Sequence, residues 1–177
     1  WGYSMGAATA LMHASRDPSL AGIVADSPFC DLWQLIQEVC FHFLRVPPLL
    51  LRPLMHVVRF VILHKANFDI WQVSPQAHCG ASFVPAFFLH GAKDTFVAPD
   101  HSEKLRGIYS GEAQRLLMPE RAHASPRSDA CTARAAVFLV RALRWEAHLP
   151  EGDGERAFAG LLAGRGGAPA RAPGGGG

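Results

Sequence analysis

The sequence lacks an excess of charge of either sign. Lys and Arg number 17 and Asp and Glu number 15, which gives a net charge of +2 over 177 residues. The cations are scattered, and no basic stripe interleaved with aromatic residues is present. Because nucleic-acid-binding domains gather positive charge on one face, we expect no nucleic-acid partner.

Cysteine is also scarce, and no C-x-x-C pair occurs. The four cysteines are widely spaced, at Cys30, Cys40, Cys79 and Cys131. This spacing favours reduced thiols in an intracellular, cytoplasmic protein over a disulfide framework. No secretory leader is visible, but we expect the chain to begin inside a fold, so this says nothing about targeting.

No long uninterrupted hydrophobic run is present. A membrane-spanning helix needs roughly 20 consecutive apolar residues, and the most apolar segment, 46–63, is broken by three prolines, Arg52, His56 and Arg59. We therefore expect no spanning helix. A lid over an active site is the favoured interpretation, ahead of simple core packing, and peripheral contact with a membrane is a lesser alternative.

The apolar residues that are present predict an α/β fold. The hydrophobic fraction is 49% and the mean hydropathy is +0.10, enough for a buried core. Segments of strand length alternate with segments of helical periodicity, which indicates a parallel sheet flanked by helices. The expected strands are 20–25, 84–91 and 114–118, and the expected helices are 5–14, 32–44, 54–65, 99–109 and 130–145.

The most informative motif lies at the start of the chain. Gly2-Tyr3-Ser4-Met5-Gly6 is a G-x-S-x-G pentapeptide, followed at once by the small apolar residues of the predicted helix. This pattern is typical of a nucleophile elbow, a sharp strand-to-helix turn with the serine at its apex. We expect both glycines because the strained turn leaves no room for a Cβ on either side.

An acid and a histidine follow in the order that this topology requires. A serine hydroxyl is a poor nucleophile unless a base takes its proton and an acid orients that base. Asp94 follows the strand 84–91, and His123 follows the strand 114–118. Because the carboxyl ends of parallel strands open on one edge of a sheet, we predict that Ser4, Asp94 and His123 lie together.

Alternatives remain for each member of this trio. Asp26 follows the preceding strand and is a rival acid, while Asp94 could instead form a turn. His123 could be a surface residue. His101 lies at a helix start and is interpreted as a capping or packing residue.

The same chemistry needs an oxyanion hole of two preorganised N–H groups. The backbone N–H of Met5, the residue after the nucleophile, is the expected first donor, and the second should come from a loop that this chain does not contain. No metal or other cofactor is implied. Five histidines on the presumed helices have no metal-ligand spacing and are interpreted as structural or surface residues: His13, His42, His56, His64 and His148.

These residues resemble an α/β-hydrolase, specifically its serine aminopeptidase-like branch in plants and algae. The resemblance covers roughly residues 1–145 and implies the C-terminal half of that fold, an N-terminally truncated domain with a helical lid at about 31–80. It also implies that Ser4 is the nucleophile, Asp94 the acid and His123 the base. It is carried by Trp1-Gly2-x-Ser4-Met5-Gly6-Ala7, Asp17-Pro18-Ser19, Ala21-Gly22, Asp26-Ser27-Pro28-Phe29, Lys65-Ala66-x-Phe68-Asp69-Ile70, Pro85-Ala86, His90-Gly91-x-x-Asp94 and His101-Ser102.

Together the patterns predict a partial hydrolase domain over 1–149 and a disordered Gly/Ala/Pro-rich tail over 150–177. The predicted function is cleavage of an ester, thioester or amide in a small-molecule, acyl or peptidyl substrate through an acyl-enzyme. The alternative is a catalytically inactive fragment or binding module that keeps the fold. In that fragment, strand 20–25 would lack a partner and form an exposed sheet edge.

Overall fold

The computed structural model describes residues 1–145, 149 and 153–164. They belong to two compact units, Trp1–Pro126 and Arg127–Gly177, and each unit is described here by itself. The boundary between them lies earlier than the expected one at residue 149.

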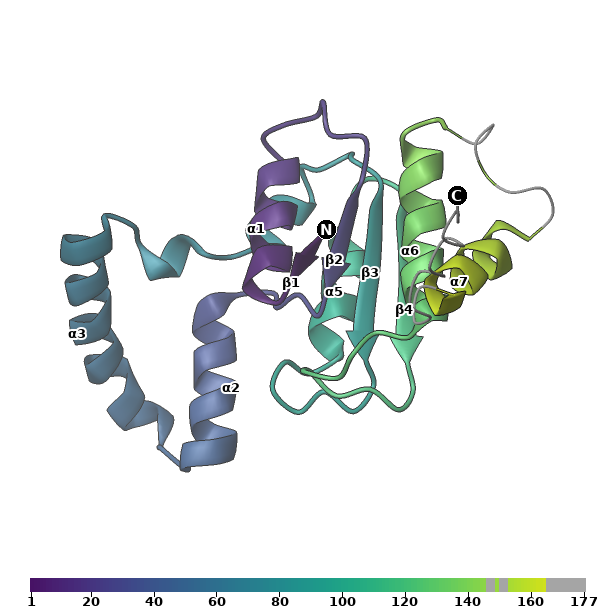
Figure 1. Ribbon diagram of the computed structural model, residues 1–177. Helices are drawn as coiled ribbons and strands as arrows, with labels where there is room; N and C mark the ends of the chain where they lie inside the picture. Colours follow the sequence, from purple (N-terminus) through teal and green to yellow (C-terminus); the bar gives the residue numbers. More distant parts are fainter. Residues whose placement is uncertain (146–148, 150–152, 165–177) are drawn as a thin grey trace, which may run out of the picture. The chain divides into compact units, whose positions relative to one another are not determined.

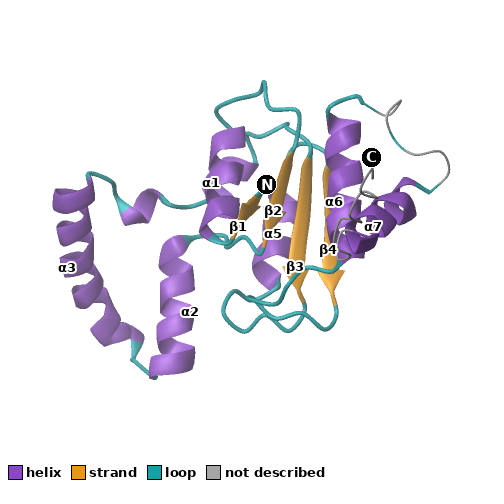
Figure 2. Cartoon of the chain, viewed as in Figure 1, coloured by secondary structure: helices purple, strands orange, loops and turns teal. Residues whose placement is uncertain are grey.

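A four-stranded parallel sheet forms the centre of the first unit (Figures 1 and 2). Its strands are β1 (Gly2–Tyr3), β2 (Ile23–Asp26), β3 (Ala86–Gly91) and β4 (Ala113–Met118), and they lie side by side in that order. The predicted parallel α/β architecture is thus confirmed, with strand ends within three residues of the expected ones.

The expected exposed edge at 20–25 is wrong. Gly2 pairs with Ala25 and Tyr3 with Asp26, so β2 lies between β1 and β3. The two residues ahead of Ser4 thus cover the second half of β2, whereas the register gives Ile23 and Val24 partners on β3 alone.

The helices α1 (Met5–Ala14) and α5 (Asp100–Ile108) share one core with the sheet. That core includes Ala25 of β2 and Phe88 of β3, while their neighbours Val24 and Phe87, which point to the opposite face, are equally buried. Burial on both faces explains why these strands read as continuous apolar runs.

A helical hairpin extends from the sheet between β2 and β3 (Figure 1). Its arms are α2 (Leu32–Leu44) and α3 (Pro48–Ala66), and the short η1 (Ile70–Gln72) and α4 (Gln76–Cys79) lead back to β3. The Asp31 side chain caps α2 by accepting the Gln34 N–H at 3.1 Å. No helix in the described ranges is long and apolar enough to cross a membrane.

Helix α3 begins six residues earlier than the expected start at 54. Pro48 occupies its first turn, where a missing N–H costs no hydrogen bond. Pro53 lies inside the helix and removes only one backbone bond. These prolines, which on sequence alone favour an interruption of the helix, therefore lie in the first two turns of a longer one.

The second unit contains α6 (Asp129–Ala142) and α7 (Gly154–Gly164). The expectation of a disordered tail is wrong for 154–164, where the Ala- and Leu-containing run forms α7. Asp153 starts this helix by accepting the N–H groups of Glu155 and Arg156 at 3.1 and 3.3 Å. Residues 150–152 and 165–177 of the expected tail lie outside the described ranges.

None of the four cysteines takes part in a disulfide. Cys30 and Cys79 are buried in the core below α1, and burial raises the pKa of Cys30 to about 11 and that of Cys79 to about 12. Cys40, on α2, is only half-buried.

We therefore expect thiol reagents to distinguish these positions. At pH 8 fewer than about one in a hundred Cys30 or Cys79 thiols is ionised, so Ellman's reagent should modify Cys40 at least about a hundredfold faster. Cys40→Ser should remove the fast phase from the native protein. A fast phase that survives this substitution would contradict the burial described.

Candidate functional site

Ser4 lies at the turn between β1 and α1 with an unusual backbone. Its φ is 52° and its ψ is −113°, a conformation that costs a non-glycine residue roughly 1–3 kcal/mol. The turn is held by the Ser4 N–H, which donates to the Asp26 carbonyl at 2.8 Å, and by the Ser4 carbonyl, which accepts the Ala8 N–H at 3.1 Å. This strained strand-to-helix turn is the geometry that the pentapeptide predicts.

The two glycines of the pentapeptide have different roles. A Cβ on Gly2 would lie 2.2 Å from the Gly6 carbonyl oxygen, so no side chain fits there. A Cβ on Gly6 would meet nothing within 4 Å among the described residues. The expectation that both positions lack room is correct for Gly2 and wrong for Gly6.

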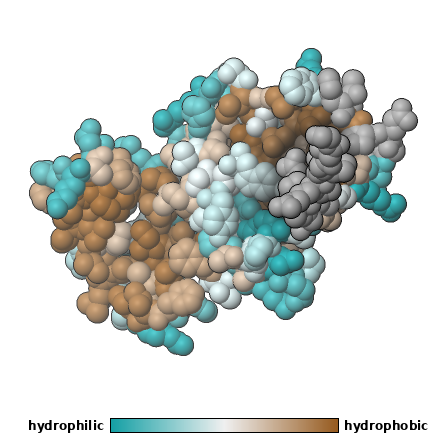
Figure 3. All heavy atoms as spheres, in the orientation of Figure 1, coloured by the Kyte–Doolittle hydropathy of each residue, from teal (hydrophilic) through white to brown (hydrophobic). Residues whose placement is uncertain are grey.

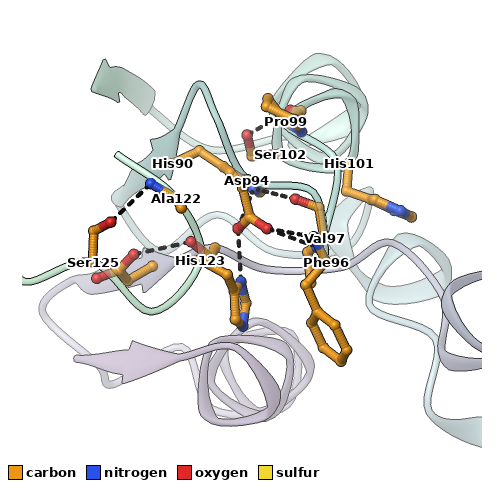
Figure 4. Close-up of polar contacts among 12 residues, drawn as sticks. His90, Asp94, Phe96, Val97, Pro99, His101, Ser102, Ala122, His123 and Ser125 are labelled. Atoms are coloured by element: carbon orange, nitrogen blue, oxygen red, sulfur yellow. Dashed lines mark hydrogen bonds and ion pairs between the residues drawn. The ribbon is translucent and has the colours of Figure 1, made fainter. Parts of the chain in front are cut away.

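Asp94 is anchored in the turn that follows β3. Its carboxylate oxygen Oδ1 accepts the backbone N–H groups of Phe96 at 3.0 Å and Val97 at 2.8 Å, and the residue is 4% exposed. The other oxygen, Oδ2, lies 2.7 Å from Nδ1 of His123 (Figure 4). An ionised carboxylate only accepts hydrogen bonds, so Nδ1 of His123 carries the proton.

His90 supports the same turn from inside the sheet. It is fully buried, its Nε2 lies 2.9 Å from the Val97 carbonyl oxygen, and the same nitrogen lies 3.4 Å from Asp94 Oδ2. A carbonyl only accepts, so Nε2 is the protonated nitrogen. Nδ1 of His90 has no hydrogen-bond partner among the described residues.

These contacts decide the ionisation of Asp94. Burial by itself raises the pKa of the carboxyl, but the hydrogen bonds from His90, the Val97 N–H and His123 outweigh it and hold the pKa below its ordinary value. Asp94 is therefore a carboxylate at neutral pH, as an acid that orients and stabilises an imidazole must be.

His123 lies in the loop after β4 and is fixed against the elbow. The Tyr3 hydroxyl donates to the His123 backbone carbonyl at 2.8 Å, and the His123 ring centroid lies 5.1 Å from those of both Tyr3 and Phe96. Within the loop, the Ser125 Oγ accepts the Ala122 N–H at 3.0 Å. Tyr3 immediately precedes Ser4, so the imidazole lies against the residue before the candidate nucleophile.

The structure thus brings together the predicted acid and base, on the loops after neighbouring strands. The rival acid Asp26 lies at the end of β2, where its Oδ1 accepts the Ser27 hydroxyl at 3.3 Å, whereas the carboxylate at His123 Nδ1 is that of Asp94. The loop positions of Asp94 and His123 followed from strand order alone. The roles of Tyr3 and His90 were missed, because nothing in their spacing indicates the hydrogen bond of Tyr3 to the loop after β4 or that of His90 to the turn after β3.

His101, interpreted above as a capping or packing residue, is buried away from this contact. Its Nδ1 accepts the Cys30 N–H at 3.1 Å, and its Nε2 lies 2.8 Å from the Glu38 carboxylate. It ties α5 to the base of the hairpin. His148 lies outside the described residues, and within them no group of three His, Cys, Asp or Glu side chains is arranged to hold a metal ion.

A cavity of about 370 Å³ opens beside Asp94, between α2 and residues 94–98. Val39 and Phe41 of the hairpin and Phe96 give it apolar walls, and Phe96 also contacts the His123 ring. Its volume is within the range of small-molecule sites.

Comparison with known proteins relates this arrangement to a fold. No family model and no curated protein matches the sequence. Solved structures do match: an acetyl xylan esterase from Thermoanaerobacterium sp. (TM-score 0.57, 12% identity, 80% of this chain and 44% of that one) and an esterase from Pyrococcus furiosus (TM-score 0.54, 21% identity, 79% and 51%). A monoacylglycerol lipase from Paleococcus ferrophilus is also similar (TM-score 0.53, 18% identity, 80% and 67%).

These likenesses show the fold alone, because all three identities are low. The chain has part of an α/β-hydrolase fold, and it spans about half the length of the two esterases.

The difference between the two glycines generates a paired prediction. Gly2→Ala should lower the free energy of unfolding by about 1–3 kcal/mol, because the new methyl group overlaps backbone atoms of α1. Gly6→Ala should leave stability unchanged or slightly raised, because alanine favours a helix. Thermal unfolding of both variants tests this, and equal losses would contradict the steric assignment.

The lowered pKa of Asp94 predicts a pH dependence of stability. A carboxyl whose pKa is lower in the folded state stabilises the protein above its ordinary pKa, about 3.9, and loses that contribution as pH falls through the folded value. The difference in unfolding free energy between the native sequence and Asp94→Asn should therefore be larger at pH 5 than at pH 3 and shrink below about pH 4. Urea titrations measure it, with the exposed Asp100→Asn as control, and a difference that grows on acidification would contradict it.

Proposed function

We propose that Ser4, Asp94 and His123 form the catalytic triad of a serine hydrolase that cleaves an ester, thioester or amide. One observation carries the proposal, the 2.7 Å contact between Asp94 Oδ2 and His123 Nδ1. The loop that holds His123 is itself hydrogen-bonded to Tyr3, the residue before Ser4. The strained backbone of Ser4 supports it, since strain of this kind gathers at functional sites. The esterases and the lipase among the structural neighbours are compatible with this chemistry.

In the proposed mechanism His123 acts as the base. With Nδ1–H directed at Asp94, Nε2 is available to take the proton of the Ser4 hydroxyl while Oγ forms a bond to the carbonyl carbon of the substrate. The imidazolium then returns that proton to the leaving alcohol, thiol or amine as its bond to carbon breaks. A water then gives a proton to the same nitrogen as its oxygen bonds to the acyl carbon. The bond from that carbon to Ser4 Oγ breaks, the imidazolium returns the proton to Oγ, and the acid is released.

The oxyanion of each tetrahedral intermediate needs donors, and we assign the first to the N–H of Met5. This residue is the first of α1, so its N–H has no partner within the helix and lies at the positive end of the helix dipole. We expect the second donor from a loop that precedes the elbow in complete hydrolases of this fold. Each donor is worth on the order of a hundredfold in rate.

The cavity beside Asp94 suggests which part of the substrate it would hold. Its walls combine apolar side chains from α2 and the Asp94 turn with the carboxylates of Glu38 and Asp94, so an uncharged acyl group fits it better than an anionic one. The helical hairpin would then act as the lid that sets substrate choice. The sequence motifs favour the serine aminopeptidase-like branch within the fold.

An activity-based probe tests the triad. A fluorophosphonate should label Ser4 in this chain and in any longer product that carries it. Labelling should disappear in Ser4→Ala and fall on the order of 10⁴-fold in rate in Asp94→Asn, because the wrong histidine tautomer results. The exposed Ser19→Ala is the matched control and should label normally.

Labelling that survives Ser4→Ala would overturn the assignment of the nucleophile. A complete absence of labelling in a folded protein, in this chain and in the longer product alike, would instead favour the alternative of a binding module that keeps the fold without activity. Circular dichroism of each variant separates loss of chemistry from loss of structure.

A further inference from the structure

The helical hairpin, defined as α2 and α3, exposes an unusual amount of apolar surface. Figure 3 shows hydrophobic residues over most of this part of the molecule. The six most exposed large hydrophobic side chains on it have at least 61% of their surface accessible: Phe41, Leu44, Leu49, Leu50, Val57 and Phe60. Isolated exposed apolar residues need no explanation, but a contiguous patch marks a binding surface.

This exposure is not a poorly packed core, because α3 has a separate apolar stripe that holds the hairpin together. Leu51 and Met55 are 3% and 5% exposed and pack with Ile70 of η1, and Val58 and Ile62 extend the stripe. One position earlier in each case, residues 50, 54, 57 and 61 form a second stripe, which is exposed. A helix with apolar residues beyond its core-facing stripe is expected to bury them against a second apolar partner.

Most charges on the hairpin are positive. The one carboxylate of α2 and α3, Glu38, is paired with His101 at the base of the hairpin. From residue 39 to residue 68 the sequence contains four cations, Arg45, Arg52, Arg59 and Lys65, and no Asp or Glu. Arg59 is paired with Asp69 at 2.8 Å, whereas in the described part of the chain the other three make no salt bridge and are exposed. Apolar and mostly cationic groups together complement a surface of acyl chains and anionic headgroups.

We propose that the hairpin docks on the surface of a bilayer that contains anionic lipid, independently of the catalytic proposal. The end of α2 and the exposed apolar side chains of α3, which are the second stripe together with Leu49 and Phe60, enter the boundary between headgroups and acyl chains, about 5–10 Å deep. Arg45 and Lys65 meet lipid phosphates or carboxylates, whereas Arg52 lines a pocket with Asp31 and Trp71. Arg52, Pro53 and Arg59 interrupt α3, so it lies along the surface.

Vesicle co-sedimentation tests this with the whole chain. The protein should pellet with vesicles of phosphatidylcholine and phosphatidylserine, should bind pure phosphatidylcholine about tenfold or more weakly, and should be released by salt. Arg45→Gln with Lys65→Gln should reduce binding to the serine-containing vesicles about tenfold or more. Leu49→Ser with Phe60→Ser should reduce binding to both vesicle types, because these side chains are among the most exposed apolar ones on α3.

Matched controls make the result specific. Phe83→Ser removes a side chain that is 75% exposed but lies outside the hairpin, before β3, and should leave vesicle binding unchanged. Ser4→Ala should also bind normally, so failure of the catalytic proposal leaves this outcome untouched. Thermal unfolding verifies that each variant is folded.

Three outcomes would overturn the proposal. One is the absence of binding to either vesicle type, and another is binding that the Leu49 and Phe60 substitutions do not change. The third is a dimer by light scattering that becomes a monomer in Leu49→Ser with Phe60→Ser and does not bind vesicles, which would assign the patch to a second copy. If further residues of a longer form of the protein covered the hairpin, that form would bind neither vesicle type.

Discussion

The hydrogen bond between Asp94 and His123 is the contact on which the candidate site depends. It joins the turn after β3 to the loop after β4, and each partner is itself fixed. Two backbone N–H groups and His90 hold the carboxylate, and the Tyr3 hydroxyl holds the histidine backbone. Because the pKa of Asp94 stays below its ordinary value despite burial, the bond is made by a charged carboxylate, which strengthens it and fixes the histidine tautomer.

The parallel sheet makes this meeting possible. In register, Gly91 of β3 pairs with Met118 of β4, so the two loops leave the sheet at the same level. They then approach so closely that a Cβ on Gly91 would lie 2.2 Å from the Arg121 carbonyl oxygen. The Lys93 N–H donates to that same oxygen at 2.9 Å. Residue 91 must therefore be glycine for the two loops to pack, and His90 helps to hold the Asp94 carboxylate in place.

Much of this arrangement could be predicted from the sequence where the signal is local. The helices at 5–14 and 32–44 match α1 and α2 because apolar periodicity and a capping Asp31 define them. The start of α3 and the existence of α7 were mispredicted. Proline ends many helices but also fits the first turn of one, as Pro48 does here. Glycine is typical of irregular segments, but a capped helix such as α7 tolerates it. The roles of Tyr3 and His90 depend on contacts across more than one element or with a turn, and no spacing rule encodes such contacts.

The central claim is that a protonated His123 Nδ1 is bonded to the Asp94 carboxylate beside the Ser4 elbow. Proton NMR in water measures this most directly, since such an imidazole proton resonates far downfield of the amide region and exchanges slowly. We predict one such resonance that is present in the unmodified chain and in Ser4→Ala, and absent in Asp94→Asn and His123→Gln. A folded protein without this resonance, or one in which it survives Asp94→Asn, would contradict the account.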